Sequence, residues 1–180
     1  MHEGEKFNFI THLIGSIAAL FGLIALVIAT VGKGEFLPLL SVTVYGASLV
    51  LLYAFSTLNH SLKGKAKNLF QKLDFLAIYF LIAGTYTPFS LITLKDSGGW
   101  IILCLVWTLA ILGIYWEFTP HSGNRVRPLF VYLIMGWVIL LAVKPLQQAL
   151  GWAGFSWLLV GGLFYTLGIV FYVFDDKVKH

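Results

Sequence analysis

The residues of this sequence that can do chemistry are ionisable side chains inside or at the ends of long apolar runs. They are His12, His60, Asp74, Glu117 and Lys144. An ionisable group at membrane depth is costly to bury, so each is a candidate functional residue that needs a partner. His60 closes one apolar run and Asp74 opens the next, which makes them candidate partners for each other.

His60 and Asp74 can meet if one helix runs to a membrane face and the next returns from it. Ser56 lies four residues before His60, one turn away on the same helix face. The spacing therefore predicts that Ser56, His60 and Asp74 line one small cavity between helices. His12, about one turn into the first apolar run, starts from the same side and can join them.

Two interpretations of this cluster remain open from spacing alone. Imidazole and carboxylate are zinc ligands, and a catalytic zinc uses three protein ligands plus a water whose pKa falls to about 7. Such a water at the membrane interface can attack a lipid ester or amide. Alternatively, His60 and Asp74 are interfacial polar groups that cap two helices around a solvated loop, since two candidate ligands fall short of three.

The composition places the chain in a lipid bilayer. Of its 180 residues, 59% are hydrophobic and 11% charged, and the mean hydropathy is +0.88. This is far more apolar than an average soluble domain. The apolar runs are long and continuous rather than alternating, which favours helices over a strand barrel. We expect an all-α, polytopic membrane helix bundle that forms a single domain over residues 1–180.

Six runs are long enough to span a bilayer, for which about 20 residues are needed. They cover approximately residues 9–31, 37–58, 75–94, 100–116, 129–146 and 152–174. The first is preceded by MHEGEKFN rather than by a positive region and a cleavage site, so we expect it to be a retained helix.

The distribution of lysine and arginine predicts the orientation in the membrane. With six helices, one side receives Lys6, Lys63, Lys65, Lys67, Lys72, Arg125, Arg127, Lys177 and Lys179, and the other receives Lys33, Lys95 and Lys144. The positive-inside rule then places both chain ends in the cytoplasm. The lysines between residues 63 and 72 are expected to form a basic loop.

The net charge of +4 does not indicate a nucleic-acid-binding protein, because the basic residues fall between apolar runs and form no stripe within a soluble module. Membrane lipids are the expected partners, and Arg125 and Arg127 are expected to meet anionic headgroups. The lone Cys104 offers neither a disulfide framework nor a thiolate zinc cluster. The sequence does not determine the oligomeric state.

Several separated motifs occur in a characteristic order. They are NFITH from Asn8, STLNH from Ser56, LDFLAIYFLIAGTYTP from Leu73, MGW from Met135, GGLFYTLG from Gly161 and FY from Phe171. Together they resemble the hemolysin III family, the bacterial branch of the progestin and adipoQ receptor family, which includes the adiponectin receptors. The resemblance covers nearly the whole chain and implies a protein of the bacterial inner membrane.

The resemblance implies seven helices around a zinc ion. It assigns His60 as a direct zinc ligand, Asp74 as a carboxylate that binds the metal directly or through water, and Ser56 as a polar neighbour of the metal-bound water. Two histidines four residues apart at the start of a seventh helix complete the family's site. The implied activity is zinc-dependent, ceramidase-like hydrolysis of a lipid amide or ester, with Asp74 orienting or deprotonating the water. A receptor-like membrane sensor or a pore-forming cytolysin is the alternative.

Three departures from the family pattern are visible. Asn59 stands where many bacterial relatives have tyrosine, and Phe75 where many have histidine; neither removes an expected ligand. The sequence also stops after DDKVKH, where the seventh helix should begin. His180 is then either the first histidine of the pair or the residue leading into it. We expect a truncated form of a seven-helix protein rather than a complete six-helix protein.

Overall fold

A computed structural model describes residues 4–119 and 126–178 of the chain, and the regular structure within these ranges is helical. The elements are α1 (Lys6–Val31), α2 (Phe36–Ser61), α3 (Gly64–Pro88), the π-helical turn η1 (Phe89–Thr93), α4 (Gly99–Glu117), α5 (Val126–Trp137), the 3-10 segment η2 (Val138–Ala142) and α6 (Val143–Val178). The predicted all-α membrane bundle is confirmed.

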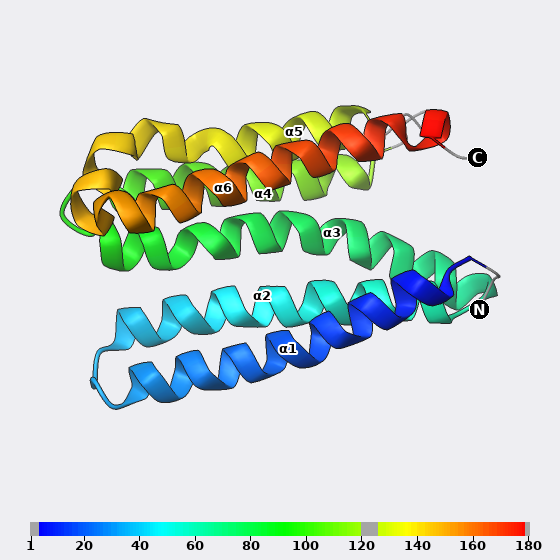
Figure 1. Ribbon diagram of the computed structural model, residues 1–180, viewed down its shortest axis with the longest axis horizontal. Coiled ribbons are helices and arrows are strands. Elements are labelled where there is room, and N and C mark those ends of the chain that lie inside the picture. The colour runs from blue at the N-terminus through cyan, green and yellow to red at the C-terminus, as the bar shows by residue number, and fades with distance from the viewer. Residues whose placement is uncertain (1–3, 120–125, 179–180) are drawn as a thin grey trace.

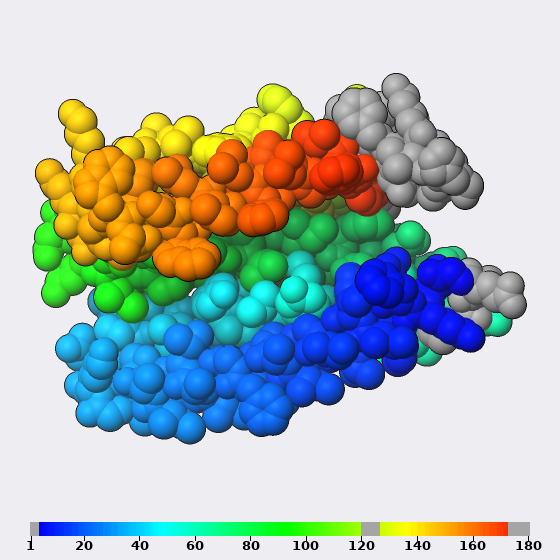
Figure 2. Space-filling view, viewed as in Figure 1, coloured from blue at the N-terminus to red at the C-terminus, as the bar shows by residue number. Residues whose placement is uncertain are grey.

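The helices run roughly side by side along one long axis, and α3 lies in the middle of the bundle (Figure 1). It packs against α2 on one side and against α4 and α5 on the other. α1 covers α2, and α6 packs on α5. The space-filling view shows α1 and α6 on the same face, with α2 and α3 visible in the furrow between them (Figure 2).

The buried core forms around α3 and the helices on its α4 side. Its members include Tyr79, Ala83, Tyr86, Val106, Ala110, Met135 and Leu146. By contrast, large apolar side chains on the outside of the bundle are exposed, as at Ile101 and Trp157, with 74% and 78% of their surface accessible. An apolar exterior of this kind suits a lipid environment, because lipid tails solvate it without cost.

The number of spanning helices differs from the predicted six. Five helices are long and apolar enough to cross a membrane, and the last of these stretches, Arg127–Tyr172, contains both of the final predicted runs. Gly151, with φ 65° and ψ 177°, interrupts the helical backbone within α6. The chain doubles back in this region, so one continuous stretch holds two antiparallel arms (Figure 1). Hydropathy could not show whether a short polar junction ends a helix or bends it.

The start of α3 also differs from the sequence prediction. The run expected from residue 75 belongs to a helix that begins at Gly64, so Lys65, Lys67 and Lys72 lie on α3 rather than in a loop. The connection from α2 consists of Leu62 and Lys63, both extended, before Gly64 turns the chain with φ 61°. Lysine, alanine and glutamine favour helix. A search for long apolar runs nevertheless overlooks the polar first turns of such a helix.

Candidate functional site

A cluster of polar side chains lies where α1, α2 and α3 come together. Ser56, Asn59 and His60 lie within the last two turns of α2, and Asp74 lies on α3. Ser56 and Asn59 are buried, with 2% and 7% of their surface accessible. The short connection between α2 and α3 makes the two helices antiparallel, which brings the end of one beside the beginning of the other.

Asp74 is held by two donors from α2. The Ser56 hydroxyl donates to Oδ2 of Asp74 at 3.2 Å, and the Asn59 side-chain amide donates to the same oxygen at 3.1 Å. Hydrogen bonds that converge on one oxygen of a carboxylate fix its orientation. The Asp74 carboxylate therefore enters the cluster in a defined position.

His12 joins the cluster from α1. Its Nδ1 atom lies 2.5 Å from Oγ of Ser56. A hydroxyl has one hydrogen to donate, and Ser56 gives it to Asp74, so the Nδ1–H of His12 must donate to Ser56. This arrangement forms a chain from His12 through Ser56 to Asp74 and leaves a lone pair on Nε2 of a neutral His12.

His60 contacts the cluster through its ring rather than through a hydrogen bond to Asp74. The imidazole rings of His60 and His12 meet edge to face, with centroids 5.3 Å apart and planes at 89°. Nδ1 of His60 is buried and has no hydrogen-bond partner, and Oδ1 of Asn59 is in the same situation. Unpaired buried polar atoms are costly, so each of these two atoms can be satisfied by a ligand, ion or water.

Close packing between α1 and α2 positions His12. Gly15 lies one turn beyond His12, and a Cβ atom there would come within 2.6 Å of the Tyr53 ring. The absence of a side chain at Gly15 thus allows Tyr53 to lie against α1. The His12 ring also meets Tyr53 edge to face, at a centroid distance of 6.0 Å.

Comparison with known proteins places this architecture in a family. The family model described as Haemolysin-III related matches residues 2–179. The chain belongs to this family. Hemolysin-3 of Bacillus cereus is 46% identical over 172 residues, which cover 95% of this chain and 78% of the relative. The Hemolysin-3 homolog of Bacillus subtilis strain 168 is 43% identical over 177 residues, 98% of this chain and 83% of the relative.

More distant relatives of this haemolysin-III related chain occur in animals. The human Monocyte to macrophage differentiation factor is 32% identical over 143 residues, which cover 75% of this chain and 58% of that protein. No solved structure matches the chain. Family membership and the five apolar helices together identify a multi-pass membrane protein.

The structure of this haemolysin-III related chain brings Ser56, Asp74 and His12 into one hydrogen-bonded chain, with His60 against His12. Among the described residues, no group of three or more histidine, cysteine, aspartate or glutamate side chains is placed to hold a metal ion. The remaining ionisable candidates lie elsewhere: Glu117 is the last residue of α4, and Lys144 lies in the first turn of α6. His180 lies outside the described residues.

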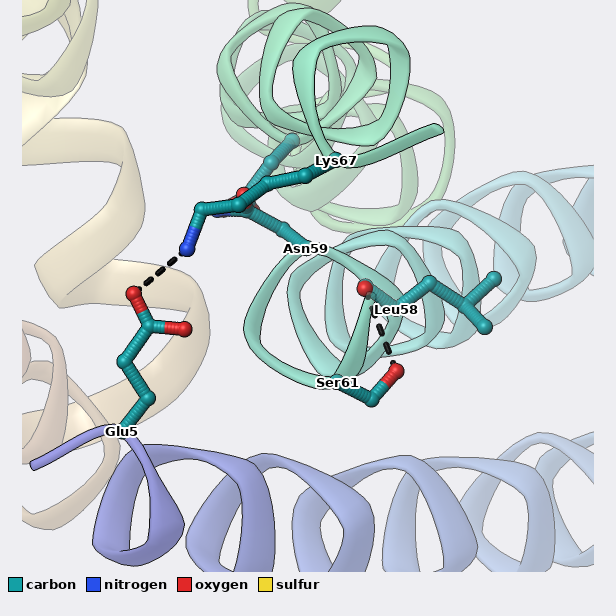
Figure 3. A network of polar contacts seen from close by, with 6 residues as sticks. Glu5, Leu58, Asn59, Ser61 and Lys67 are labelled. Atoms are coloured by element: carbon teal, nitrogen blue, oxygen red, sulfur yellow. Dashed lines mark hydrogen bonds and ion pairs between the residues drawn. The ribbon is translucent and has the colours of Figure 1, made fainter. Parts of the chain in front are cut away.

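Sequence reasoning missed two features of this region. Asn59, noted only as a departure from the family pattern, is a direct partner of Asp74. Its spacing of three from Ser56 places both on one helix face and was the available signal. Lys67 and Glu5 form an ion pair at 2.5 Å that no local pattern reveals. Figure 3 shows the Lys67 side chain leaving α3 and pointing toward Glu5, just ahead of α1.

Proposed function

We propose that this haemolysin-III related protein is a membrane hydrolase of lipid amides or esters, with the cluster of His12, Ser56, Asn59, His60 and Asp74 as its centre. The observation that carries the proposal is the buried, unpartnered Nδ1 of His60, within a cluster that also holds an oriented carboxylate. Buried polar groups without a partner are rare in structural roles and frequent where a ligand binds.

Zinc is the proposed cofactor; from the described part of the chain, His60 would bind it directly and Asp74 directly or through water. Their chemistry fits, because imidazole nitrogen and carboxylate oxygen are preferred zinc donors. The described residues do not supply a third ligand, and His180, which the resemblance offers, lies outside them. When bound, zinc would supply Lewis-acid chemistry and a water acidified to react near neutral pH.

The protein's own residues have distinct proposed roles. The bonds from Ser56 and Asn59 both go to Oδ2 of Asp74, so Oδ1 is the oxygen proposed to take up a proton from the attacking water. Ser56 also links Asp74 to His12, which fixes the carboxylate relative to α1. Asp74 and Ser56 are thus the proposed catalytic pair, and His60 holds the ion.

An apolar cavity of about 330 Å³ lies between α3, α5 and α6 and is the proposed acyl-chain site. Its lining includes Ile78 and Ile82, which follow Asp74 at intervals of four along α3. Residues four apart share a helix face, so the cavity begins one turn beyond Asp74 on that face. An acyl chain in this cavity would place the bond to be cleaved toward the polar cluster.

The proposed orientation places both ends of the described chain on the cytoplasmic side of the bacterial inner membrane. The start of α1, the α2–α3 connection and the end of α6 lie at one end of the bundle (Figure 1). The basic residues Lys65, Lys67 and Lys72 lie at this same end. The positive-inside rule supports the cytoplasm for it.

Turnover by the purified full chain tests the function. Fatty-acid release would be followed by mass spectrometry from a panel of ceramides, glycerolipid esters and N-acyl amides, each supplied in mixed micelles. We expect Asp74→Asn and His60→Ala to lower the rate at least about 100-fold, because each removes a group needed in the transition state. Ser61→Ala is the control, since among the described residues its hydroxyl bonds only to the Leu58 carbonyl of its own turn. An unchanged rate in Asp74→Asn, or marker leakage from liposomes without lipid cleavage, would refute the hydrolase.

A further inference from the structure

A second cavity lies on the other side of α3 from the polar cluster, where α4 ends and α5 begins. Its volume is about 710 Å³. Tyr79 of α3 forms its buried floor, and Gly113 of α4 allows the Tyr79 ring to approach, because a Cβ there would come within 2.2 Å of that ring. Trp116 and Phe130 contribute aromatic walls. The size is that of a site for one small molecule or one lipid headgroup with the start of its chains.

Two charged side chains also line this cavity, Glu117 and Arg127. The Oε1 atom of Glu117 is buried and has no hydrogen-bond partner. Within the part of the chain that the structure describes, Glu117 and Arg127 form no ion pair with each other. A buried carboxylate oxygen is costly unless a donor satisfies it, so the cavity presents an unsatisfied acceptor and a separate cation.

We propose that this cavity binds a phospholipid with a zwitterionic ethanolamine headgroup. The ammonium group donates to Oε1 of Glu117, the phosphate pairs with Arg127, and the acyl chains leave along the aromatic wall toward the bilayer. Arg127 lies in the first turn of α5, where a helix N-terminus adds favourable interaction with an anion. The cavity's place at two helix ends puts it at the depth of lipid headgroups.

The unsatisfied oxygen selects among headgroups. An ethanolamine ammonium carries N–H donors, whereas the trimethylammonium of choline carries none. A glycerol headgroup has hydroxyl donors but no cationic group, so its hydrogen bond to the Glu117 carboxylate lacks the attraction of an ammonium. The site is therefore specific for phosphatidylethanolamine over phosphatidylcholine and phosphatidylglycerol. It does not depend on the hydrolase proposal, because none of its residues belongs to the polar cluster.

Native mass spectrometry of the full chain in detergent tests the site. Dioleoyl lipids with ethanolamine, choline or glycerol headgroups are titrated separately, and bound lipid is counted per chain. We expect phosphatidylethanolamine to bind about tenfold more tightly than either competitor, which corresponds to one charge-assisted hydrogen bond. Glu117→Gln should remove this preference, and Arg127→Gln should weaken binding of all three lipids. Lys95→Gln, at the opposite end of the bundle, is the matched control for loss of one cation and should change nothing.

Equal binding of the three lipids by the wild-type chain would overturn the proposal. A preference for phosphatidylglycerol that is lost in Arg127→Gln would also overturn it. That result would show that the site attracts negative charge and does not recognise the ethanolamine group. Thermal unfolding of each variant confirms folding. If Glu117→Gln does not fold, Glu117→Asp withdraws the carboxylate by one methylene and should lower the preference severalfold; an unchanged preference in that variant overturns the site.

Discussion

Nδ1 of His12 lies 2.5 Å from Oγ of Ser56, although the two residues are 44 positions apart and come from different helices. Because Ser56 in turn donates to Asp74, this one hydroxyl joins α1, α2 and α3. A side chain that is itself buried and links three helices has both a structural and a chemical consequence.

Removal of the Ser56 hydroxyl should destabilise the bundle. Ser56→Ala leaves His12 without its partner and leaves Asp74 with Asn59 alone. A buried polar group that loses its partner costs about 1–3 kcal/mol, so thermal unfolding in detergent should shift to lower temperature. Ser61→Ala, on the same helix, should leave the transition unchanged. Equal transitions in the two variants would contradict a linking role for Ser56.

Asn59 should act on Asp74 through its amide hydrogen. Asn59→Ala removes one of the two donors to Oδ2, and Asn59→Asp replaces that donor with a second carboxylate. Like charges at hydrogen-bond distance repel strongly in a buried setting, so Asn59→Asp should destabilise the fold more than Asn59→Ala. Chemical denaturation of both variants gives the comparison, and the reverse order would show that the contact is unimportant.

The two glycines Gly15 and Gly22 provide a matched pair on α1. A Cβ at Gly15 would collide with the Tyr53 ring, whereas one at Gly22 meets nothing within 4 Å. Gly15→Ala should therefore cost about 1–3 kcal/mol through overpacking. Gly22→Ala should be neutral or stabilise by up to about 1 kcal/mol, because alanine is the better helix former. Similar stabilities for both variants would show that α1 does not pack against Tyr53.

The ion pair between Glu5 and Lys67 should contribute little to stability. Each residue lies two turns before a cluster member, His12 or Asp74, so the pair joins the helix ends roughly 10 Å outside the cluster. Its side chains are 21% and 25% accessible, and such partly exposed pairs contribute about 1 kcal/mol or less. A double-mutant cycle with Glu5→Gln and Lys67→Met measures the coupling. A coupling free energy of several kcal/mol would contradict this, because it would require the two side chains to be more deeply buried than the structure shows.

Much of the fold was predictable because each apolar run is long enough to identify a membrane-spanning helix. The meeting of Ser56 and Asp74 was also predictable, since Ser56 lies near the end of one apolar run and Asp74 opens the next, which returns from the same membrane face. The beginning of α3 was not, because hydropathy detects only the part of a helix that lies in lipid. The bend at Gly151 depends on one backbone conformation, which composition does not reveal.

The polar partners were harder to predict than the helices. Asn59 shares a helix face with Ser56, yet nothing in the sequence states which donor reaches Asp74. The contact of Lys67 with Glu5 joins two distant segments and depends on how α1 lies against the bundle. The sequence suggested that His60 pairs with Asp74, but the His60 ring instead contacts the ring of His12. Only the positions of the side chains reveal this.

The metal content of the purified full chain tests the central claim most directly. After removal of loosely bound ions, elemental analysis of the wild-type chain should give about one zinc per chain, because His60 and Asp74 are proposed to hold the ion. His60→Ala should lose that zinc while retaining its helical circular dichroism, and Ser61→Ala should keep it. Wild-type protein without zinc, or zinc retained in full by His60→Ala, would contradict the account.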